Sequence, residues 1–362
     1  WSSDVCSSDL KLTNKPSLIE IKTKIGYGSV VEGSEKAHGS PLKSENTEKL
    51  KEKLNWCYSD KFYVPNEVYQ YVDEVLKEKE KVEKKWNKQF EEYKIKNKDL
   101  YLKLQSFLNM EKPVELLNSD ILYNFSEDIS TREASGKILN KISKKMSNLF
   151  GGSADLAPSN KCVMENFEYF SHNTKFGANI HFGVREHAMA AIANGLFLYG
   201  GIKPFISTFF VFSDYLKPAL RLSALMKLGV IYILTHDSIG VGEDGPTHEP
   251  IEQLAMIRSI PDVVVFRPCD WKETAAAWSY AINNDKHPTV MVLSRQKLKN
   301  IENTGRGALK GAYILKDSRN GNPELIIIAT GSEVGIALEA ADILEKEGRK
   351  IRVVSKIGRA HV

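Results

Sequence analysis

The chain of 362 residues is long enough for two or more domains, and 42% hydrophobic with 27% charged residues is typical of a folded protein with a buried core. This composition excludes intrinsic disorder, a collagen repeat and a disulfide scaffold. The 50 basic and 46 acidic residues leave a formal charge of only +4, which does not favour nucleic-acid binding.

The chain has four widely separated cysteines: Cys6, Cys57, Cys162 and Cys269. They form no C-x-x-C pair, which argues against a zinc cluster and favours free thiols in a reducing, cytoplasmic compartment. No apolar run reaches the roughly 18 residues that a membrane helix needs, because Asn194 and a Gly pair interrupt the best candidate. We therefore expect no membrane contact.

The two ends differ from the rest of the chain. Residues 1–10 have neither the charged nor the apolar region of a signal peptide, and residues 356–362 follow a strand-like segment abruptly. Both resemble foreign sequence that flanks a partial gene. We expect both tails to lie outside the fold.

The first part of the chain predicts one strand and two helices. Residues 17–23 have the composition of a strand, which leads into a Gly/Ser-rich connection that holds His38. Residues 44–55 and 66–96 have helical patterns. In the second of these, Glu and Lys recur three and four positions apart, which is typical of a solvated linker helix.

After about residue 118, short apolar runs alternate with helical segments, which predicts an α/β fold with a parallel sheet. Residues 230–235, 262–266 and 289–294 should be neighbouring parallel strands, and residues 324–355 a further strand-helix-strand unit. Ligands of open α/β sheets bind beyond the carboxyl ends of the strands. The residues that directly follow the three strands are His236, Asp237, Arg267, Arg295 and Gln296.

The segment after the first of these strands, residues 236–250, is a Gly-rich loop that contains two histidines and four carboxylates. One interpretation is a plain loop in which Asp237 or Ser238 caps a helix. The other is a functional site, because loops on a rigid scaffold often carry function. His236, Asp244 and His248 do not match a short metal-ligand spacing, so we expect no metal here.

Two further segments have a structural and a functional interpretation. Glu186 opens an Ala-rich helical segment, where a carboxylate stabilises the positive end of the helix dipole whether or not it serves a site. Phe209, Phe212 and Tyr215 are three residues apart and would form a stripe on a helix. Such stripes usually belong to a core and less often line a ring-binding pocket.

Residues 130–136 and 151–160 contain possible hydrogen-bond donors for an anion, namely Arg132, Ser159 and a Gly pair. The planar fork of donors on Arg suits phosphate. Taken one at a time, these segments indicate only an α/β protein with a polar cleft that binds an anionic metabolite.

Together and in this order, the segments resemble the transketolase family over residues 11–355. The matching strings are IGYGS, AHGSPL, FYVPNEVY, GGSADLAPSN, FGVREHAMAAIANG, STFFVFSDY, THDSIGVGEDGPTHEP and LSRQKL. The resemblance implies a thiamine diphosphate-binding fold that transfers a two-carbon ketol unit from a ketose phosphate to an aldose phosphate in the pentose phosphate pathway. It also implies a homodimer that acts on xylulose 5-phosphate, ribose 5-phosphate and erythrose 4-phosphate.

The resemblance assigns the cofactor-binding residues. Glu186 matches the glutamate that hydrogen-bonds the aminopyrimidine ring of the cofactor and so promotes formation of the nucleophilic ylide. The aromatic pocket around the pyrimidine corresponds to Phe209, Phe212 and Tyr215, and other residues near the cofactor to Asp155, Ile25 and His38. A dry aromatic pocket would strengthen the hydrogen bond made by the glutamate.

The substrate-binding residues implied by the resemblance are His38, Arg132, Ser159, His236, Asp244, His248 and Arg295. In the family, the histidines matched by His38 and His248 are catalytic and exchange protons with the ketol oxygens. The aspartate matched by Asp244 recognises a sugar hydroxyl. The other four residues bind the substrate phosphate, which helps to place the reacting carbon.

One family feature is absent from the sequence. The family's first domain carries a Gly-Asp-Gly motif that holds Mg²⁺ (or Ca²⁺ or Mn²⁺) and the diphosphate, and this string does not occur here. We expect the metal ligands in a missing N-terminal part and assign none in this chain. The chain alone is therefore expected to be inactive.

The implied layout is the end of a diphosphate-binding domain (11–64), a charged linker (65–118), a complete pyrimidine-binding domain (119–300) and a partial C-terminal domain (301–355). A dihydroxyacetone synthase, a 1-deoxyxylulose 5-phosphate synthase and a non-catalytic fragment are the alternatives.

Overall fold

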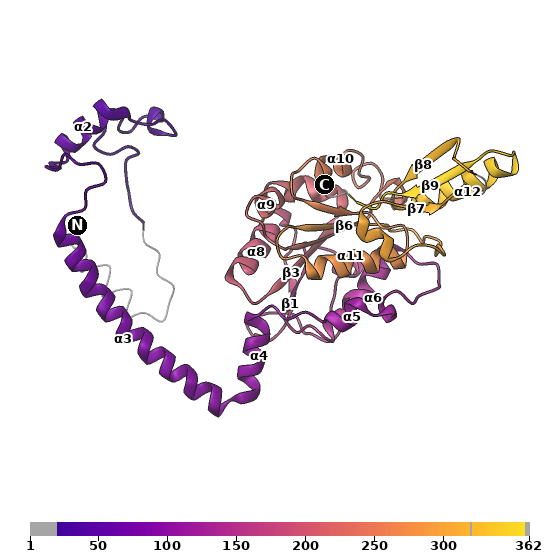
Figure 1. Ribbon diagram of the computed structural model, residues 1–362, viewed down its shortest axis with the longest axis horizontal. Helices are drawn as coiled ribbons and strands as arrows, with labels where there is room; N and C mark the ends of the chain where they lie inside the picture. The colour runs from indigo at the N-terminus through magenta and orange to yellow at the C-terminus, as the bar shows by residue number, and fades with distance from the viewer. Residues whose placement is uncertain (1–19, 319–320, 359–362) are drawn as a thin grey trace. The chain divides into compact units, whose positions relative to one another are not determined.

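The computed structural model describes residues 20–318 and 321–358, and the chain divides into two compact units, Trp1–Glu92 and Tyr93–Val362 (Figure 1). The N-terminal tail expected at residues 1–10 lies outside the described residues, as do residues 359–362.

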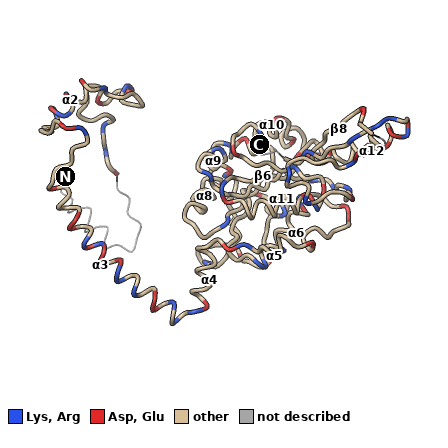
Figure 2. Tube along the Cα trace, viewed as in Figure 1, with Lys and Arg blue, Asp and Glu red and all other residues tan. Residues whose placement is uncertain are grey.

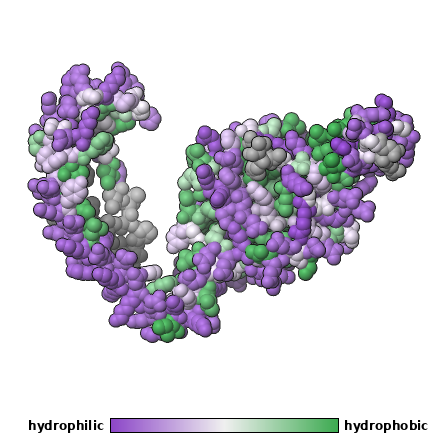
Figure 3. Space-filling view, in the orientation of Figure 1, coloured by the Kyte–Doolittle hydropathy of each residue, from purple (hydrophilic) through white to green (hydrophobic). Residues whose placement is uncertain are grey.

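The first unit is helical where it is described. It contains the 3₁₀ turn η1 (Glu35–Ala37), helix α2 (Lys43–Lys53) and most of helix α3 (Asn66–Lys96). Helices α2 and α3 confirm the two helices predicted from the sequence. Helix α3 has no buried residue, basic and acidic residues alternate along it (Figure 2), and its surface is mostly hydrophilic (Figure 3).

The prediction of a strand at residues 17–23 is wrong for residues 20–23, which are the part of this segment that the structure describes. Residues 20–24 have no regular secondary structure, and residues 20–92 contain no strand. A strand needs the backbone groups of a neighbouring strand as hydrogen-bond partners. Without such a partner, Ile21 is 63% exposed and contributes nothing to a core.

The second unit is built on a six-stranded parallel sheet with the strand order β2-β1-β3-β4-β6-β5. The strands are β1 (Leu149–Ser153), β2 (Asn179–His181), β3 (Lys203–Phe209), β4 (Ile231–Thr235), β5 (Val264–Phe266) and β6 (Thr289–Leu293). The three predicted strands are β4, β5 and β6, and β6 pairs in parallel with both of the others. The α/β fold and this part of its sheet are thus confirmed.

Helices cover both faces of the sheet (Figure 1). One face carries α6 (Thr131–Ser143) and α11 (Trp271–Asn283), and the other carries α8 (Glu186–Tyr199), α9 (Ser213–Leu225) and α10 (Gln253–Arg258). Strand β4 shows the consequence: Ile231 and Ile233 belong to the first core, while Tyr232 and Leu234 belong to the second. Burial on both faces explains why the strand is apolar throughout.

Shorter elements connect these layers. They are α4 (Lys98–Leu108), α5 (Val114–Asn118), η2 (Asp120–Leu122), α7 (Ala157–Asn160), η3 (Phe210–Phe212), η4 (Ile239–Val241) and η5 (Arg306–Lys310). Helix α7 follows β1, and η3 and η4 follow β3 and β4. These three elements therefore lie at the carboxyl ends of parallel strands, where ligands of such sheets bind.

A second sheet has the strand order β7-β9-β8, from β7 (Tyr313–Lys316), β8 (Leu325–Ala329) and β9 (Ile351–Ser355), with α12 (Glu333–Lys346) between β8 and β9. Strands β8 and β9 are parallel and confirm the predicted strand-helix-strand unit. Residues 356–358, which the sequence assigned to a foreign tail, continue from β9 into the core. Ile357 is fully buried there, and Gly358 bridges to Phe266.

Candidate active site

A cavity of about 470 Å³ lies where β3 and α7 end and α8 begins. Its lining residues are Asp155, Leu156, Asn160, Val184, Glu186, Thr208, Phe209, Phe212, Tyr215 and His248. The structure thus brings together five of the residues proposed for the cofactor with one of the two proposed catalytic histidines. They come from four segments that are far apart in the sequence.

Three aromatic rings form one wall of this cavity. Phe209 ends β3, Phe212 ends η3 and Tyr215 lies in the first turn of α9. The ring centroids are 6.3 Å apart for Phe209 and Phe212 and 6.0 Å apart for Phe212 and Tyr215. A 3₁₀ helix has three residues per turn, so side chains three apart stay on one side even though the segment is not a continuous α-helix.

Glu186 is the buried carboxylate of the cavity. It is the first residue of α8 and is 8% exposed. The helix N-terminus favours a negative charge at this position, and the hydroxyl of Thr208 donates to Oε1 at 3.3 Å. The carboxylate is therefore held by two neighbouring elements at the edge of the aromatic wall.

His236 lies directly behind Phe209. It follows β4 with φ at +62°, a left-handed conformation that is uncommon for residues other than glycine, and it is 2% exposed. Its ring stacks on Phe209, with centroids 3.6 Å apart. Burial, together with the positive charges of Arg132 and Arg295, lowers the pKa of His236 to about 4. The imidazole is therefore neutral at pH 7.

Helix α6 positions Arg132 beside His236. The backbone N–H of Thr131 donates to Ser294 Oγ at 3.0 Å, and the N–H of Ser294 donates to Thr131 Oγ1 at 2.7 Å, which fixes the start of α6 at the end of β6. Arg132 Nη1 then lies 3.2 Å from His236 Nε2 and donates to the carbonyl oxygen of Ser159 at 2.9 Å.

Arg132 and Arg295 form a positive cluster. Burial lowers the pKa of Arg132, and the charge of Arg295 lowers it further, while Glu133 opposes both effects. Two cations that repel each other at the end of a sheet gain stability from an anion bound between them. Arg295 is exposed and Arg132 half-buried, so such an anion can approach from solvent.

The loop after β4 carries the other two predicted residues of this segment. His248 is half-buried, and its ring meets Phe212 edge-on at a centroid distance of 5.5 Å. Asp244 is exposed. The structural interpretation of the loop also holds, because Ser238 Oγ accepts from the N–H of Gly240 at 3.2 Å and caps η4.

Not every polar residue after a strand belongs to the site. Arg267 pairs with Asp237 at 2.8 Å and with Glu333, and it donates to the carbonyl oxygen of Thr330 at 2.9 Å. These contacts join the large sheet to the loop between β8 and α12. Gln296 lies against η4 at Gly240. Arg267 and Asp237 therefore have a structural role.

The Gly pair suggested as an anion donor is also structural. Gly151 and Gly152 lie inside β1 and are buried. A Cβ atom on Gly151 would lie 1.8 Å from the carbonyl oxygen of Phe205, and one on Gly152 would lie 2.0 Å from that of Ile180. Glycine is needed here because neighbouring strands approach closely.

Two of the predicted site residues, His38 and Ile25, belong to the first unit. His38 follows η1 and is exposed, and Ile25 is 48% exposed.

Sequence reasoning missed several residues of this region: Asn160, Thr235, Thr208, Leu156 and Val184. Thr235 joins Asn160 to His236 through its hydroxyl. Two of them could have been found from the sequence, because Thr235 directly precedes His236 and Thr208 directly precedes Phe209. The contact between Asn160 and Thr235 gave no signal because 75 residues separate them.

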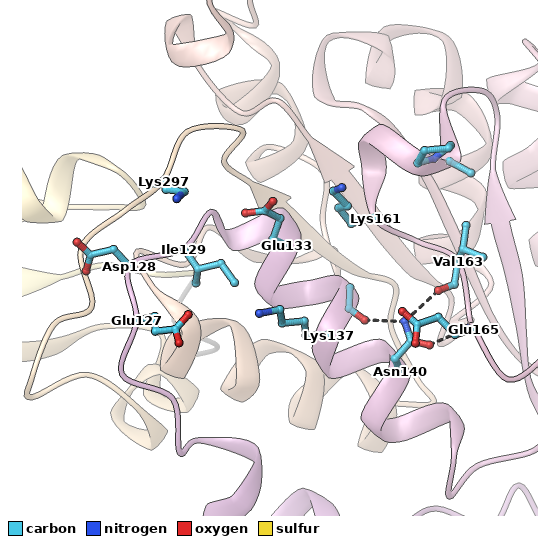
Figure 4. Close-up of a pocket in the computed structure, with 13 residues that line it drawn as sticks. Glu127, Asp128, Ile129, Glu133, Lys137, Asn140, Lys161, Val163, Glu165 and Lys297 are labelled. Atoms are coloured by element: carbon cyan, nitrogen blue, oxygen red, sulfur yellow. Dashed lines mark hydrogen bonds between the residues drawn. The ribbon is translucent and has the colours of Figure 1, made fainter.

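Another cavity, of about 540 Å³, is lined by residues of α6 and α7 and of the segment that follows α7 (Figure 4). Glu133, Lys137 and Asn140 follow one another along α6 on one wall, and Lys161 and Glu165 lie on another. Its lining contains both lysines and carboxylates, which favours neither an anion nor a cation.

In residues 20–318 and 321–358, no three His, Cys, Asp or Glu side chains are placed to hold one metal ion. No helix in the same ranges is long and apolar enough to cross a membrane.

Family models match most of the chain. A model described as "Transketolase, pyrimidine binding domain" matches residues 127–300, and "Transketolase, thiamine diphosphate binding domain" matches residues 6–113. A third, "Transketolase-like TK C-terminal domain", matches residues 311–358. The cavity and the arginine cluster both lie within the range of the pyrimidine-binding model.

Individual relatives agree with these models. The chain is 47% identical to a transketolase of Bacillus subtilis over 347 residues, which are 94% of this chain and 52% of the relative. It is 42% identical to a chloroplastic transketolase of Craterostigma plantagineum, of which it covers 67%. A crystal structure of transketolase from Campylobacter jejuni matches 98% of this chain and 54% of its own, with 42% identity and a TM-score of 0.85.

The chain spans about half the length of most relatives that it matches. The exception among those named above is the Craterostigma protein, of which two thirds are covered. High identity over nearly all of this chain, together with the three family models, leads to one conclusion: the chain belongs to the transketolase family.

Proposed function

We propose that the protein to which this chain belongs transfers a two-carbon ketol unit from a ketose phosphate to an aldose phosphate in the pentose phosphate pathway. The observation that carries the proposal is the buried Glu186 at the edge of an aromatic cavity, next to the Arg132–His236 cluster. The family supports a transketolase reaction in general. The residues at the cavity support its individual steps.

The cavity fits the pyrimidine ring of thiamine diphosphate. Phe209, Phe212 and Tyr215 offer a flat apolar wall for a ring, and Glu186 offers a hydrogen-bond partner for a ring nitrogen. When bound, thiamine diphosphate supplies the carbon nucleophile that accepts the two-carbon unit. Asp155, in the same lining, is a further contact, and Ile25 is proposed as another from the first unit.

The proposed roles of the remaining residues follow from their places. Thr247 Oγ1 lies 2.8 Å from His248 Nδ1, so proton exchange with the ketol oxygens would use the other nitrogen, Nε2. His38 is proposed to take part in the same exchange. Asp244, exposed in the same loop, would accept a hydrogen bond from a sugar hydroxyl.

The arginine cluster favours phosphorylated substrates. Arg132 and Arg295 supply charge and donors for a phosphate group, with His236 and Ser159 beside them. Structures of Pichia stipitis transketolase, 38% identical with a TM-score of 0.88, are described as complexes with xylulose 5-phosphate and sedoheptulose 7-phosphate. We propose xylulose 5-phosphate, ribose 5-phosphate and erythrose 4-phosphate as substrates.

Three further properties are proposed together with the activity. The metal that accompanies the diphosphate is Mg²⁺, Ca²⁺ or Mn²⁺, held by residues that this chain does not include. The protein is a homodimer, which the exposed apolar side chains of α8 and α9 support, among them Ile192, Tyr199 and Leu225. The location is cytoplasmic, in keeping with free thiols at Cys57, Cys162 and Cys269.

The proposed layout keeps the boundaries expected from the sequence except at its C-terminal end, with residues 119–300 as the pyrimidine-binding domain. Residues 11–64 and 65–118 are proposed as the end of a diphosphate-binding domain and a linker, and residues 301–358, which include the segment that continues from β9 into the core, as a partial third domain. A "split gene transketolase, inactive beta4 tetramer", 30% identical with a TM-score of 0.51, supports inactivity of the chain alone.

The test offers three substrate pairs to the full-length protein with thiamine diphosphate and Mg²⁺. We expect turnover of xylulose 5-phosphate with ribose 5-phosphate. Faster turnover with formaldehyde as acceptor, or with pyruvate and glyceraldehyde 3-phosphate, would replace the proposal by a dihydroxyacetone synthase or a deoxyxylulose phosphate synthase. Calorimetry with this chain alone should detect no tight cofactor binding, and tight binding would contradict the expected inactivity.

A further inference from the structure

A buried row of hydrogen bonds leads from α7 to Arg132. It begins at Asn160, whose Nδ2 donates to the carbonyl oxygen of Asp155 at 3.4 Å and to Ser153 Oγ at 2.7 Å. A carbonyl oxygen only accepts hydrogen bonds, so the amide nitrogen of Asn160 must face it. Oδ1 of Asn160 therefore points the other way, toward β4.

Thr235 is the next member of the row. Its Oγ1 lies 2.5 Å from Asn160 Oδ1 and 2.8 Å from His236 Nδ1. Because Oδ1 of the amide only accepts, the hydroxyl proton of Thr235 must point to it. Oγ1 can then only accept from the imidazole, so Nδ1 of His236 must carry a proton.

The opposite side of the imidazole requires the same arrangement. Arg132 Nη1 lies 3.2 Å from His236 Nε2, and a guanidinium group has donors only. Nε2 must therefore present a lone pair. The same Nη1 donates to the carbonyl oxygen of Ser159 at 2.9 Å, so the guanidinium is held between two acceptors.

The surroundings keep this row dry and the imidazole uncharged. Asn160, Thr235 and His236 are each at most 2% exposed, so water does not compete for their hydrogen bonds. Arg132 and Arg295 oppose a further positive charge on the ring, as does His248, while Asp244 favours it. Together with burial, which is the largest cause, these charges lower the pKa of His236.

We propose that, in the chain without substrate, Asn160 and Thr235 are positioning residues that hold His236 in its Nδ1–H tautomer, so that Nε2 orients Arg132 toward the site of the substrate phosphate. In the other tautomer, an N–H of the imidazole would face an N–H of Arg132, and the guanidinium would have to move. The tautomer itself is independent of the proposed function. Only the last step, the binding of phosphate by Arg132, rests on it.

The first experiment measures the tautomer in the 362-residue chain, with ¹⁵N-labelled histidine. Long-range ¹H–¹⁵N spectra at pH 7 distinguish a protonated from an unprotonated ring nitrogen. We expect a protonated Nδ1 and an unprotonated Nε2 for His236, identified by the loss of its signals in His236→Gln. A protonated Nε2, or rapid exchange between the tautomers, would overturn the proposal. This measurement needs no variant of the row itself.

The second experiment removes the hydroxyl group. Thr235→Val keeps nearly the same volume but cannot accept from Nδ1, so we expect a mixture of tautomers at His236, whereas Thr235→Ser should behave as the wild type. Thr247→Val is the matched control, because Thr247 makes the same 2.8 Å contact with Nδ1 of His248. It should leave the signals of His236 unchanged. An unchanged tautomer in both Thr235→Val and Asn160→Ala would refute the role of the row.

The third experiment tests the link to phosphate. Inorganic phosphate is titrated into each variant, and its dissociation constant is read from the ¹⁵N signals. We expect an increase of about tenfold in Thr235→Val, the order expected for one hydrogen bond to a charged group, and no increase in Thr247→Val. If phosphate perturbs no signal while the Nδ1–H tautomer is present, the orientation of Arg132 toward phosphate is wrong, and so is the phosphate site of the proposed function.

Discussion

The ring of Phe209 stacks on the imidazole of His236, with centroids 3.6 Å apart and planes inclined by 23°. Phe209 also lines the aromatic cavity, whereas His236 contacts Arg132. One phenyl ring therefore contacts both the proposed pyrimidine pocket and the proposed phosphate site. Its removal should affect both.

Phe209→Ala in the full-length protein is expected to weaken thiamine diphosphate binding about tenfold and to raise KM for xylulose 5-phosphate by a similar factor, since an aromatic pair contributes roughly 0.5–1.5 kcal/mol beyond its burial. Tyr215→Ala removes a ring of the same wall that is 64% exposed and does not contact His236. It should weaken cofactor binding alone. Equal effects of the two variants on KM would contradict this division.

Thr208→Val is expected to lower kcat about tenfold, because loss of a hydrogen bond to a carboxylate costs roughly 1.5 kcal/mol. The hydroxyl of Thr208 donates to Glu186 at 3.3 Å and helps to fix the direction of the carboxylate. Thr208→Ser keeps the hydroxyl and should retain most of the activity. The measurement is steady-state kinetics of the full-length protein. If the valine and serine variants had the same kcat, the hydroxyl of Thr208 would have no role in orienting Glu186.

Arg267→Met is expected to lower the free energy of unfolding by roughly 3–5 kcal/mol, because it leaves Asp237 buried without its partner. Asp237 is 6% exposed and Arg267 5%. Lys299→Met is the control, since the pair of Lys299 and Glu339 is exposed on both sides and such pairs contribute less than about 1 kcal/mol. Denaturant unfolding of the chain measures both. Similar losses in the two variants would argue against the joining role of Arg267.

His236 should make the stability of the chain depend on pH. Its pKa is about 4 in the folded state, below the 6.5 of an unperturbed histidine, so the unfolded chain binds more protons at this position between these two pH values. The contribution of His236 is therefore fully present above pH 6.5 and is lost as the pH falls toward 4. Asp270, whose pKa is raised to about 6, mainly by burial, acts in the opposite direction over part of this range.

The contribution of His236 is isolated by a difference. The free energy of unfolding is measured from pH 7 to pH 4 for the wild type and for His236→Gln, and the second curve is subtracted from the first. We expect the difference to fall steadily below pH 6.5. A difference that is independent of pH would mean that the imidazole titrates normally in the folded chain.

The sequence predicted the parts of the fold whose signal is local. Strands β4 and β6 are apolar throughout because both of their faces are buried, and α3 has a regular repeat of Glu and Lys. Strand β1 gave no such signal. Two of its five residues, Gly151 and Gly152, are glycines that serve close approach of the neighbouring strands.

The site was predictable where its residues are neighbours in the sequence. The spacing of Phe209, Phe212 and Tyr215 indicated that their rings share one side, although the segment passes from strand to 3₁₀ turn to helix. The resemblance to the family, and not the spacing, assigned that side to a pocket. The hydrogen bond that links Asn160 to Thr235 could not be predicted, because the parallel sheet brings the two residues together and no local pattern marks their contact.

The most direct test of the account is the turnover of xylulose 5-phosphate with ribose 5-phosphate by the full-length protein carrying Glu186→Ala. The control is Glu165→Ala, which removes a carboxylate from the other cavity. We predict that Glu186→Ala lowers kcat by orders of magnitude while the control retains normal turnover. Near-normal turnover in Glu186→Ala would contradict the assignment of the aromatic cavity as the active site.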